Sequence, residues 1–140
     1  MNQGFVADAS IGVAWSVAAQ ADERTERLRD TAISGVPVTI PLLWMLEVSN
    51  GLLMLVRRGR ITKAVWSEAV RLNGQIHFTV DDEAPGRALT TVLDVAMQNG
   101  LTIYDATYLE LAMRRGLPLA SRDTALNRAA KKCGVKILLQ

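Results

Sequence analysis

The feature that most constrains the fold of this chain is a regular alternation of short apolar segments with longer amphipathic ones. The short segments are rich in valine, isoleucine and leucine, which is typical of buried strands. They predict strands at residues 5–7, 36–40, 76–80, 101–103, 118–120 and 135–139. Because amphipathic helices separate these strands, the pattern predicts an α/β fold with a mainly parallel sheet.

Capping residues predict where the helices begin and end. Asp22 and Thr62 are N-cap candidates, while Gly35, Gly100 and Gly116 follow the ends of amphipathic segments. The helices predicted in this way are residues 11–19, 22–35, 42–58, 62–73, 82–100, 104–115 and 123–133. No repeat, linker or low-complexity segment interrupts the series, so we expect a single domain spanning residues 1–140.

The composition fits one soluble domain. Of the 140 residues, 49% are apolar and 21% are charged, which is enough to build one hydrophobic core. A net charge of +2 permits a nucleic acid partner without requiring one. We expect no signal peptide and no membrane segment, because the most apolar stretch, residues 41–56, is shorter than a membrane span and contains Glu47.

The chain has a single cysteine, Cys133, and a single histidine, His77. These counts exclude a disulfide framework within the chain and a zinc site built from cysteine and histidine. We therefore expect a reducing, cytoplasmic setting. A hydrolase that uses histidine as its base would depend on His77, which lies in a segment typical of a short strand.

Three aspartates follow predicted strands: Asp8, Asp105 and Asp123. Ligands of an open parallel sheet bind beyond the carboxyl ends of its strands, so these side chains are expected to meet at one edge. Each has an alternative role, because an aspartate at the start of a helix is often an N-cap that contributes roughly 1 kcal/mol. Arg122, next to Asp123, is a candidate contact for RNA or for a carboxylate.

Glu47 is the fourth candidate acid. It lies in a helix that is apolar on most sides, with no lysine or arginine within four residues to pair with it. Asn50, three residues later, shares its face. The alternative is that Glu47 points to solvent on a narrow polar stripe with Asn50.

Four carboxylates in one pocket would favour a metal. Two carboxylates about 4 Å apart repel by roughly 4 kcal/mol at an effective dielectric constant near 20. Sets of oxygen ligands suit Mg²⁺ or Mn²⁺, which activate water and stabilise the charge on a phosphodiester under attack. Ser10 could add a hydroxyl at the same edge, or cap the helix that follows it.

Four segments of this sequence resemble the motifs of PIN domains, in the same order and at similar spacing. They are residues 6–10 (VADAS), 46–50 (LEVSN), 103–112 (IYDATYLELA) and 120–126 (ASRDTAL). The resemblance covers essentially the whole chain. Ser121 stands where family members often have threonine, so the hydroxyl is kept. Single-domain chains of this size resemble VapC-type toxins of bacterial toxin–antitoxin pairs.

This resemblance implies a three-layer α/β/α domain with a parallel sheet of about five strands. It implies a Mg²⁺- or Mn²⁺-dependent endoribonuclease acting on tRNA or ribosomal RNA, a homodimer, and inhibition by a cognate antitoxin. Asp8 and Asp105 would be the main metal ligands, with Glu47 and Asp123 completing the site directly or through water. Ser10, Asn50 and Ser121 would hold the metal ligands in place from behind or orient the substrate.

Two other functions fit parts of the pattern. The first is a non-catalytic module that binds RNA or a protein, with the acids serving as helix caps. The second is a phosphoaspartate receiver or phosphatase with Asp8 as the phosphorylated residue. Phosphatases of the aspartyl class have Asp-x-Asp at the first strand, where this chain has Asp8-Ala9-Ser10. This second alternative therefore ranks last.

Overall fold

The computed structural model describes residues 3–139. Its centre is a parallel sheet with the strand order β3-β2-β1-β4. The strands are β1 (Phe5–Ala7), β2 (Val38–Pro41), β3 (Phe78–Asp81) and β4 (Leu119–Ala120). Because β1 lies between β2 and β4, its carboxyl end sits in the middle of the sheet, where side chains from several elements can converge.

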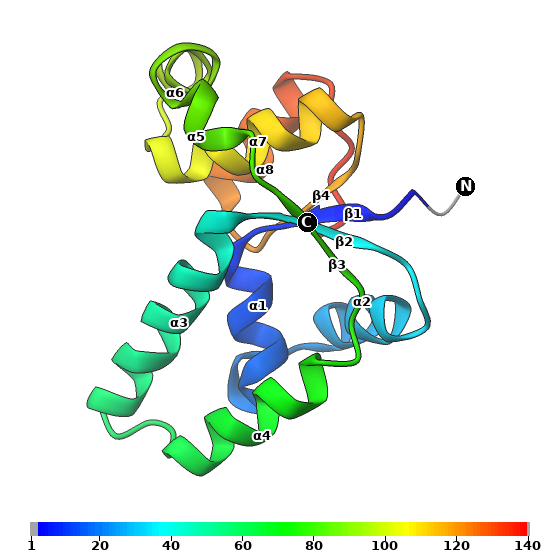
Figure 1. The fold of residues 1–140 in the computed structure, drawn as a ribbon, viewed down its shortest axis with the longest axis vertical. Helices are drawn as coiled ribbons and strands as arrows, with labels where there is room; N and C mark the ends of the chain where they lie inside the picture. The colour runs from blue at the N-terminus through cyan, green and yellow to red at the C-terminus, as the bar shows by residue number, and fades with distance from the viewer. Residues whose placement is uncertain (1–2, 140) are drawn as a thin grey trace.

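Helices cover both faces of the sheet and make the three-layer α/β/α arrangement that the sequence predicted (Figure 1). On one side lie α1 (Ala9–Ser16), a short 3₁₀ turn (Ala18–Gln20), α2 (Glu23–Ile33), α3 (Leu42–Arg57) and α4 (Lys63–Asn73). On the other lie α5 (Ala84–Arg87), a π-helical turn (Ala88–Val92), α6 (Leu93–Asn99), α7 (Ile103–Arg115) and α8 (Thr124–Lys132).

The core forms where α1 and α7 pack on opposite faces of the central strands. β1 is buried along its whole length, as expected for a central strand of a parallel sheet. Most of the middle of α7 is buried as well, including Tyr108, Leu109 and Leu111. On the other face, the rings of Phe5 and Trp15 meet edge to face at 6.4 Å. Both helices that flank the carboxyl end of β1 are thereby fixed by packing.

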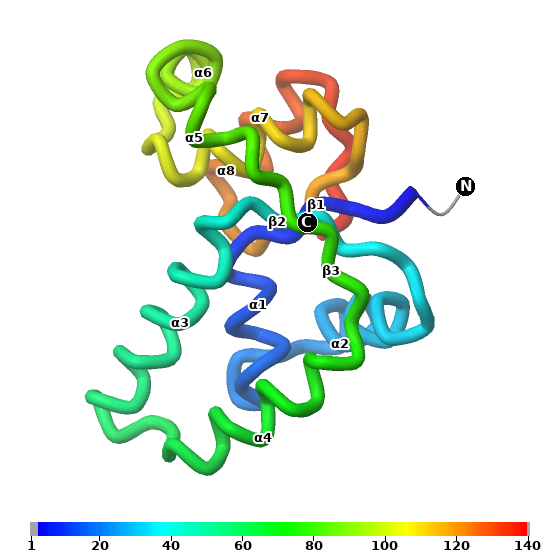
Figure 2. The backbone as a smooth tube through the Cα atoms, in the orientation of Figure 1, coloured from blue at the N-terminus to red at the C-terminus, as the bar shows by residue number. Residues whose placement is uncertain are grey.

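The backbone trace shows α3 and α4 joined into a hairpin that extends away from the sheet, with α1 packed against both (Figure 2). The loop between them carries Gly59 with a positive φ of 70°. Glu47 lies on α3 in the part of this hairpin that is near the sheet. Within residues 3–139, no helix combines the length and the apolar character needed to cross a membrane.

The local signals in the sequence placed most helix ends correctly. Asp22 and Thr62 are N-caps, each accepting a hydrogen bond from a backbone N–H three residues on. Gly100 and Gly116 end α6 and α7 with φ values of 62° and 64°. Because glycine lacks a Cβ, it adopts this left-handed conformation without steric cost. Two predicted helices differ. Helix α1 spans Ala9–Ser16 instead of 11–19, because Asp8 rather than Ser10 caps it, and a π-helical turn interrupts the helix predicted at 82–100.

Two predicted strands have another structure. The prediction for residues 101–103 was wrong, because Thr102 caps α7 and the helix begins at Ile103. Only two residues separate Gly100 from α7, which leaves no room for a strand. In the segment 135–139, a single parallel bridge joins Ile137 to Leu119 at the outer edge of β4. The described sheet therefore has four strands, with this bridge where a fifth was expected.

Candidate active site

Asp8 is the best-ordered acid of the candidate site. It follows β1 and is 5% exposed. Its Oδ1 accepts hydrogen bonds from the Ser10 hydroxyl at 2.5 Å and from the Ile11 N–H at 3.3 Å, while the Ser121 hydroxyl donates to Oδ2. The indole N–H of Trp44 donates to the Asp8 carbonyl at 2.9 Å. Three separate segments of the chain thus hold this residue in place.

Burial dominates the electrostatics of Asp8. Removal from water raises the pKa of the Asp8 carboxyl to about 6, although hydrogen bonds from Ser10, Ser121 and the Ile11 N–H act in the opposite direction. A carboxyl group that is difficult to ionise is stabilised as an anion when a cation lies next to it. Asp8 therefore differs from a solvent-exposed helix cap in its burial and in its raised pKa, although it also caps α1.

Glu47 has a partner that its own helix does not supply. The Tyr108 hydroxyl, on α7 and 61 residues away in sequence, donates to Glu47 Oε1 at 2.6 Å. The pKa of Glu47 is raised by burial and by the negative charge of Asp105, against the effect of the Tyr108 hydrogen bond. Burial and the Glu47 carboxylate also raise the pKa of Tyr108, so its proton stays on the phenol and remains available to donate.

The surroundings of Glu47 differ from the alternative in which it shares a solvent-facing polar stripe with Asn50. Glu47 is half-buried against α7, and Asn50 is exposed on α3. Several apolar side chains of the same helix are the exposed ones, with Leu46 at 72% and Met45 at 47%. Only the side of this helix formed by Trp44, Val48 and Leu52 faces the core.

Asp105 lies in the first turn of α7 and is not an N-cap. Thr102 caps the helix by accepting a hydrogen bond from the Asp105 N–H at 3.1 Å, which leaves the Asp105 carboxylate without a capping role. Burial raises the pKa of Asp105, and the charge of Asp123 raises it further. Asp123 is exposed and caps α8 by accepting from the Leu126 N–H at 3.0 Å.

The four predicted acids are electrostatic neighbours around the carboxyl end of β1. The charge of Asp105 acts on Glu47, and that of Asp123 acts on Asp105. The charges of Asp8, Glu47 and Asp105 all act on Tyr108, which lies between them. Within the described part of the chain, none of the four acids forms an ion pair with a lysine or arginine within 4.0 Å.

The donor set fits a hard divalent cation. All the candidate ligands are carboxylate oxygens. Burial raises the pKa values of Asp8, Glu47 and Asp105, and a neighbouring acid raises those of Glu47 and Asp105 further; a bound cation would lower all three. In residues 3–139, no three aspartate, glutamate, histidine or cysteine side chains converge tightly enough to hold a metal ion as they stand.

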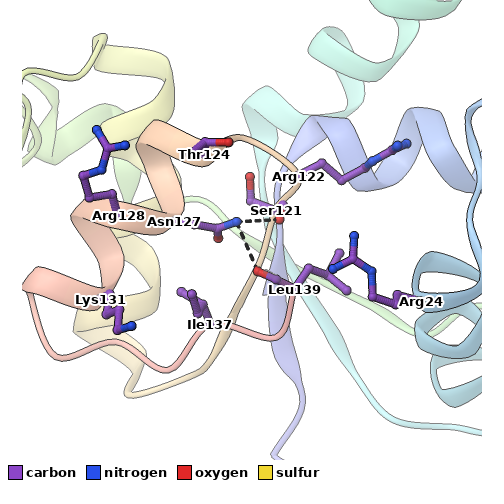
Figure 3. A pocket seen from close by; sticks show the side chains of 9 residues that line it. All are labelled: Arg24, Ser121, Arg122, Thr124, Asn127, Arg128, Lys131, Ile137 and Leu139. Carbon is purple, nitrogen blue, oxygen red and sulfur yellow. Dashed lines mark hydrogen bonds between the residues drawn. The ribbon is translucent and has the colours of Figure 1, made fainter.

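The loop after β4 connects the acids to a pocket. The Arg122 N–H donates to Ser10 Oγ at 3.0 Å and the Asp123 N–H donates to Ser121 Oγ at 2.9 Å, so this loop locks both hydroxyls that face Asp8. Ser121 also borders a pocket of about 540 Å³ between α2, α8 and the segment that ends at Leu139 (Figure 3). The side chain of Arg122, another lining residue, donates to the Gln20 carbonyl.

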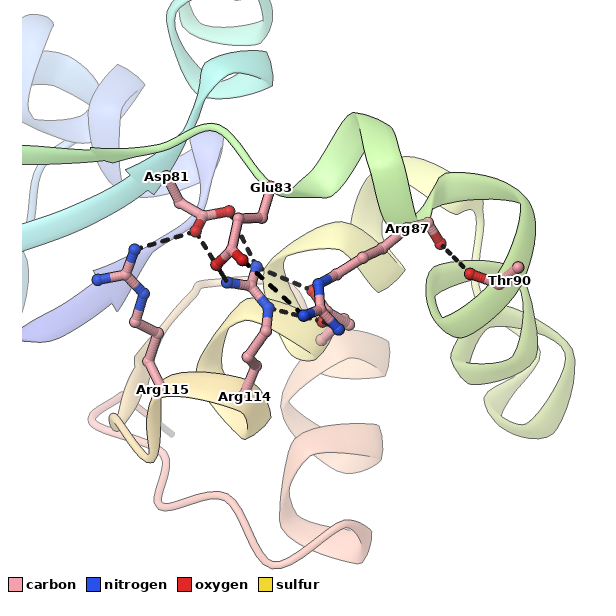
Figure 4. Close-up of polar contacts among 7 residues, drawn as sticks. Asp81, Glu83, Arg87, Thr90, Arg114 and Arg115 are labelled. Atoms are coloured by element: carbon pink, nitrogen blue, oxygen red, sulfur yellow. Dashed lines mark hydrogen bonds and ion pairs between the residues drawn. The ribbon is translucent and has the colours of Figure 1, made fainter.

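A second group of acids, at the carboxyl end of β3, is neutralised. Asp81, with its side chain fully buried, accepts two hydrogen bonds of 2.9 Å from Arg114 and one of 3.1 Å from Arg115 (Figure 4). Arg114 also bonds Glu110 and Glu83. Because the arginines neutralise these acids, the group fastens α7 to β3. Nothing near Arg114 in the sequence predicts this contact, because Asp81 lies 33 positions away.

With the geometry described, comparison with known proteins identifies the family. The family model described as the PIN domain matches residues 5–132, which is most of the chain. The chain belongs to the PIN-domain family. This confirms the resemblance drawn from the four sequence motifs. The matched region contains all four acids around the end of β1, so the candidate site of this PIN domain lies wholly within the family match.

Two relatives from Pyrobaculum aerophilum add detail. The protein is 36% identical to Exonuclease VapC9 over 86 residues, which confirms a similarity to PIN domains of the VapC type; the match spans 60% of this chain and 60% of the relative. The crystal structure of PAE2754 superposes on this PIN domain with a TM-score of 0.71 and 25% identity, over 99% of this chain and 85% of that one. The three-layer fold is therefore shared along the whole described chain.

Proposed function

We propose that this PIN domain is a Mg²⁺- or Mn²⁺-dependent endoribonuclease and the toxin of a type II toxin–antitoxin pair, cutting structured RNA such as tRNA or ribosomal RNA. The observation that carries the proposal is the contrast between two sets of acids. At β3, arginines neutralise the buried Asp81. At β1, the carboxylates of Asp8, Glu47 and Asp105 have raised pKa values and only hydroxyl or backbone N–H donors as partners.

Asp8 and Asp105 would be the main metal ligands, and Glu47 and Asp123 would complete the site directly or through water. A divalent cation bound there would activate a water molecule and stabilise the charge that develops on the phosphodiester. The chain's own residues prepare this site before the cation arrives. Ser10 and Ser121 would then orient the Asp8 carboxylate. Asn50 is exposed on α3, so it would orient the substrate only from that side.

Tyr108 is a positioning residue that the sequence analysis did not single out. Its hydroxyl fixes one oxygen of Glu47 and leaves the other oxygen free to face the site. Tyr108 itself is 1% exposed and packed in the core, so it cannot move far. The spacing of Tyr108 from Asp105, three residues on the same helix, puts both side chains on one face of α7. That spacing is the signal from which the residue could have been found.

The proposal and the name of the relative differ in where the RNA chain is cut. Exonuclease VapC9 is named for cleavage from an end, whereas an endoribonuclease cuts within the chain. We therefore propose a test with two RNA substrates, a linear structured RNA and a closed circle of the same sequence. Each is incubated with protein purified free of any inhibitor, in Mg²⁺, Mn²⁺ or EDTA. Asp8→Asn is the matched control, because asparagine can still cap α1.

Cleavage of both substrates that requires metal and disappears in Asp8→Asn is the expected result. Cleavage of the linear RNA alone would assign exonuclease action and overturn the endonuclease proposal. RNA binding with no cleavage in either metal would favour the alternative, a non-catalytic binding module. In that event the acids would serve only as caps and as partners of hydroxyl groups.

The partners of the protein are proposed on its similarity to VapC-type proteins. We expect a cognate antitoxin, a homodimer and a cytoplasmic location. Exposed apolar side chains support contact with other proteins: Leu46 on α3 is 72% exposed, and Leu89 and Met97 are 87% and 74% exposed. Light scattering on the purified protein tests the homodimer, and co-expression with the neighbouring gene product tests the antitoxin.

A further inference from the structure

An RNA strand that reaches the acidic site needs cationic side chains nearby, because both the strand and the site are negatively charged. The four carboxylates of the candidate site repel a phosphodiester backbone, so nearby cations must attract it. The net charge of the whole chain is only +2, so the position of the basic residues matters more than their number. A surface that binds the RNA strand must therefore be cationic and adjoin Asp8.

The pocket beside Ser121 meets this requirement. Ser121 lines the pocket and also donates a hydrogen bond to Asp8, so the pocket begins where the candidate metal site ends. Every charged side chain in its lining is basic. The lining consists of Arg24, Ser121, Arg122, Thr124, Asn127, Arg128, Lys131, Ile137 and Leu139. Figure 3 shows the basic residues around the hollow, with α8 on one side and Arg24 and Arg122 on the other.

The sequence of α8 builds one wall of this pocket. Thr124, Asn127, Arg128 and Lys131 are spaced at i, i+3, i+4 and i+7, so they share one face of the helix. The opposite face packs into the core through Leu126, Ala129 and Ala130. Burial of that apolar face fixes which side of α8 faces the pocket.

Of the four cations in the lining, two already have partners and two are available to a ligand. Arg24 lies 3.5 Å from Asp22, and the Arg122 side chain donates to a backbone carbonyl. In contrast, Arg128 and Lys131 form no hydrogen bond or ion pair within residues 3–139, and both are exposed. The floor between them is fixed, because the Asn127 amide donates to the carbonyls of Ser121 at 2.9 Å and Leu139 at 3.2 Å.

We propose that this pocket binds phosphate groups of the RNA strand next to the cut, with Arg128 and Lys131 as the principal contacts. The inference rests on the proposed ribonuclease function and adds the path of the substrate. The pocket offers charge and a fixed floor but contains no aromatic side chain for base stacking. It therefore recognises the backbone, and binding through it is independent of base sequence.

The test measures RNA binding without cleavage. Fluorescence anisotropy in EDTA follows the binding of labelled 12-nucleotide oligo(U) and oligo(A) across a range of salt concentrations. The test variant is Arg128→Gln with Lys131→Gln. Lys132→Gln is the control, because Lys132 is a cation of the same helix that does not line the pocket. Melting temperature is recorded for each variant to show that it is folded.

The double variant is expected to bind both oligonucleotides on the order of 10-fold more weakly, by the same factor, while Lys132→Gln binds like the wild type. Loss of two phosphate contacts lowers the slope of log K against log salt by about 1.4 for a single strand. In cleavage assays with metal, we expect the double variant to raise KM and to leave kcat nearly unchanged, because its residues lie outside the acidic site.

Three outcomes overturn the proposal. The first is wild-type affinity in the double variant. The second is an effect on oligo(U) that oligo(A) does not show, which would mean recognition of bases. The third concerns a second probe, an oligoglutamate peptide. A double variant that still binds RNA but no longer binds this peptide would assign the pocket to an acidic protein segment. Failure of the ribonuclease proposal is separate: it would appear as absence of cleavage by the wild-type protein, whatever the binding data show.

Discussion

Replacing Arg114 by methionine removes the one side chain that joins three acids at the carboxyl end of β3. Arg114 is 15% exposed, and its guanidinium contacts the side chains of Asp81, Glu110 and Glu83 at 2.6–2.9 Å at the nearest atoms. Two of these carboxylates, those of Asp81 and Glu110, are 0% and 3% exposed. Methionine keeps the length of the side chain but leaves two buried carboxylates without their main partner.

The expected loss is large because the remaining charges stay buried. Breaking a buried ion pair by removing one partner costs about 3–5 kcal/mol. For a domain of this size, each kcal/mol lowers the melting temperature by roughly 3–4 °C, so Arg114→Met should melt roughly 10–20 °C below the wild type. Arg71→Met is the matched control: Arg71 lies 2.6 Å from Glu68, but the side chains are 67% and 56% exposed. Exposed pairs contribute little, so this control should shift the melting temperature by less than about 2 °C.

The pH dependence provides a second measurement on the same variant. Hydrogen bonds from Arg114 and Arg115 hold the pKa of Asp81 below its usual value, against the effect of burial. A depressed pKa contributes stability above the pKa of the unfolded state, near 3.9, and this stability is lost as the pH falls through the pKa of the folded state. The difference between wild type and Arg114→Met should be full at pH 7 and should shrink below about pH 4. Equal melting temperatures for the Arg114 and Arg71 variants at pH 7 would refute the reasoning.

Three further substitutions test the candidate site. Tyr108→Phe removes the hydroxyl that positions Glu47 but keeps the ring, so Mn²⁺ affinity measured by calorimetry should fall about 10-fold or more; unchanged affinity would remove Tyr108 from the site. Gly12→Ala places a Cβ 2.6 Å from the Trp44 ring and should lower stability by about 1–3 kcal/mol in urea unfolding, unless the helices separate without strain. In EDTA at pH 7, Asp8→Asn should be more stable than the wild type by up to about 3 kcal/mol, because the folded-state pKa of about 6 makes ionised Asp8 unfavourable. For the same reason, the free energy of unfolding of the wild type should fall as the pH rises from about 4 to about 6. A flat pH profile would contradict this.

Local signals in the sequence were sufficient for most of the fold. Helix caps such as Asp22 and Thr62 act through backbone groups three residues away, so a short stretch of sequence contains the whole interaction. The alternation of short apolar segments with amphipathic ones likewise indicated the α/β class and placed Asp8 after a strand, while the central position of that strand came from the structure. The same reasoning failed at residues 101–103, because a segment as short as Leu101-Thr102-Ile103 can either extend a strand or begin a helix. The cap at Thr102 decided between them.

The candidate acids were found from residue type and from their place in the chain, but their partners were not. Sequence alone showed that Glu47 lacks a cation along its own helix, and the structure supplied the partner, Tyr108, from another helix. Asp81 and Arg114 lie 33 positions apart, and nothing local to either residue predicts that they meet.

The sequence by itself therefore determined most of the elements, their caps and the choice of candidate acids, because those depend on residue type and on interactions within a few residues. Only the tertiary structure decided which acids are neutralised and which are not. An arginine pairs with whichever carboxylate the packing of α7 and β3 brings within about 3 Å, and that distance depends on the whole fold rather than on spacing in the chain. For this reason the arginine-paired Asp81 and the acids around Asp8 could be told apart only in three dimensions.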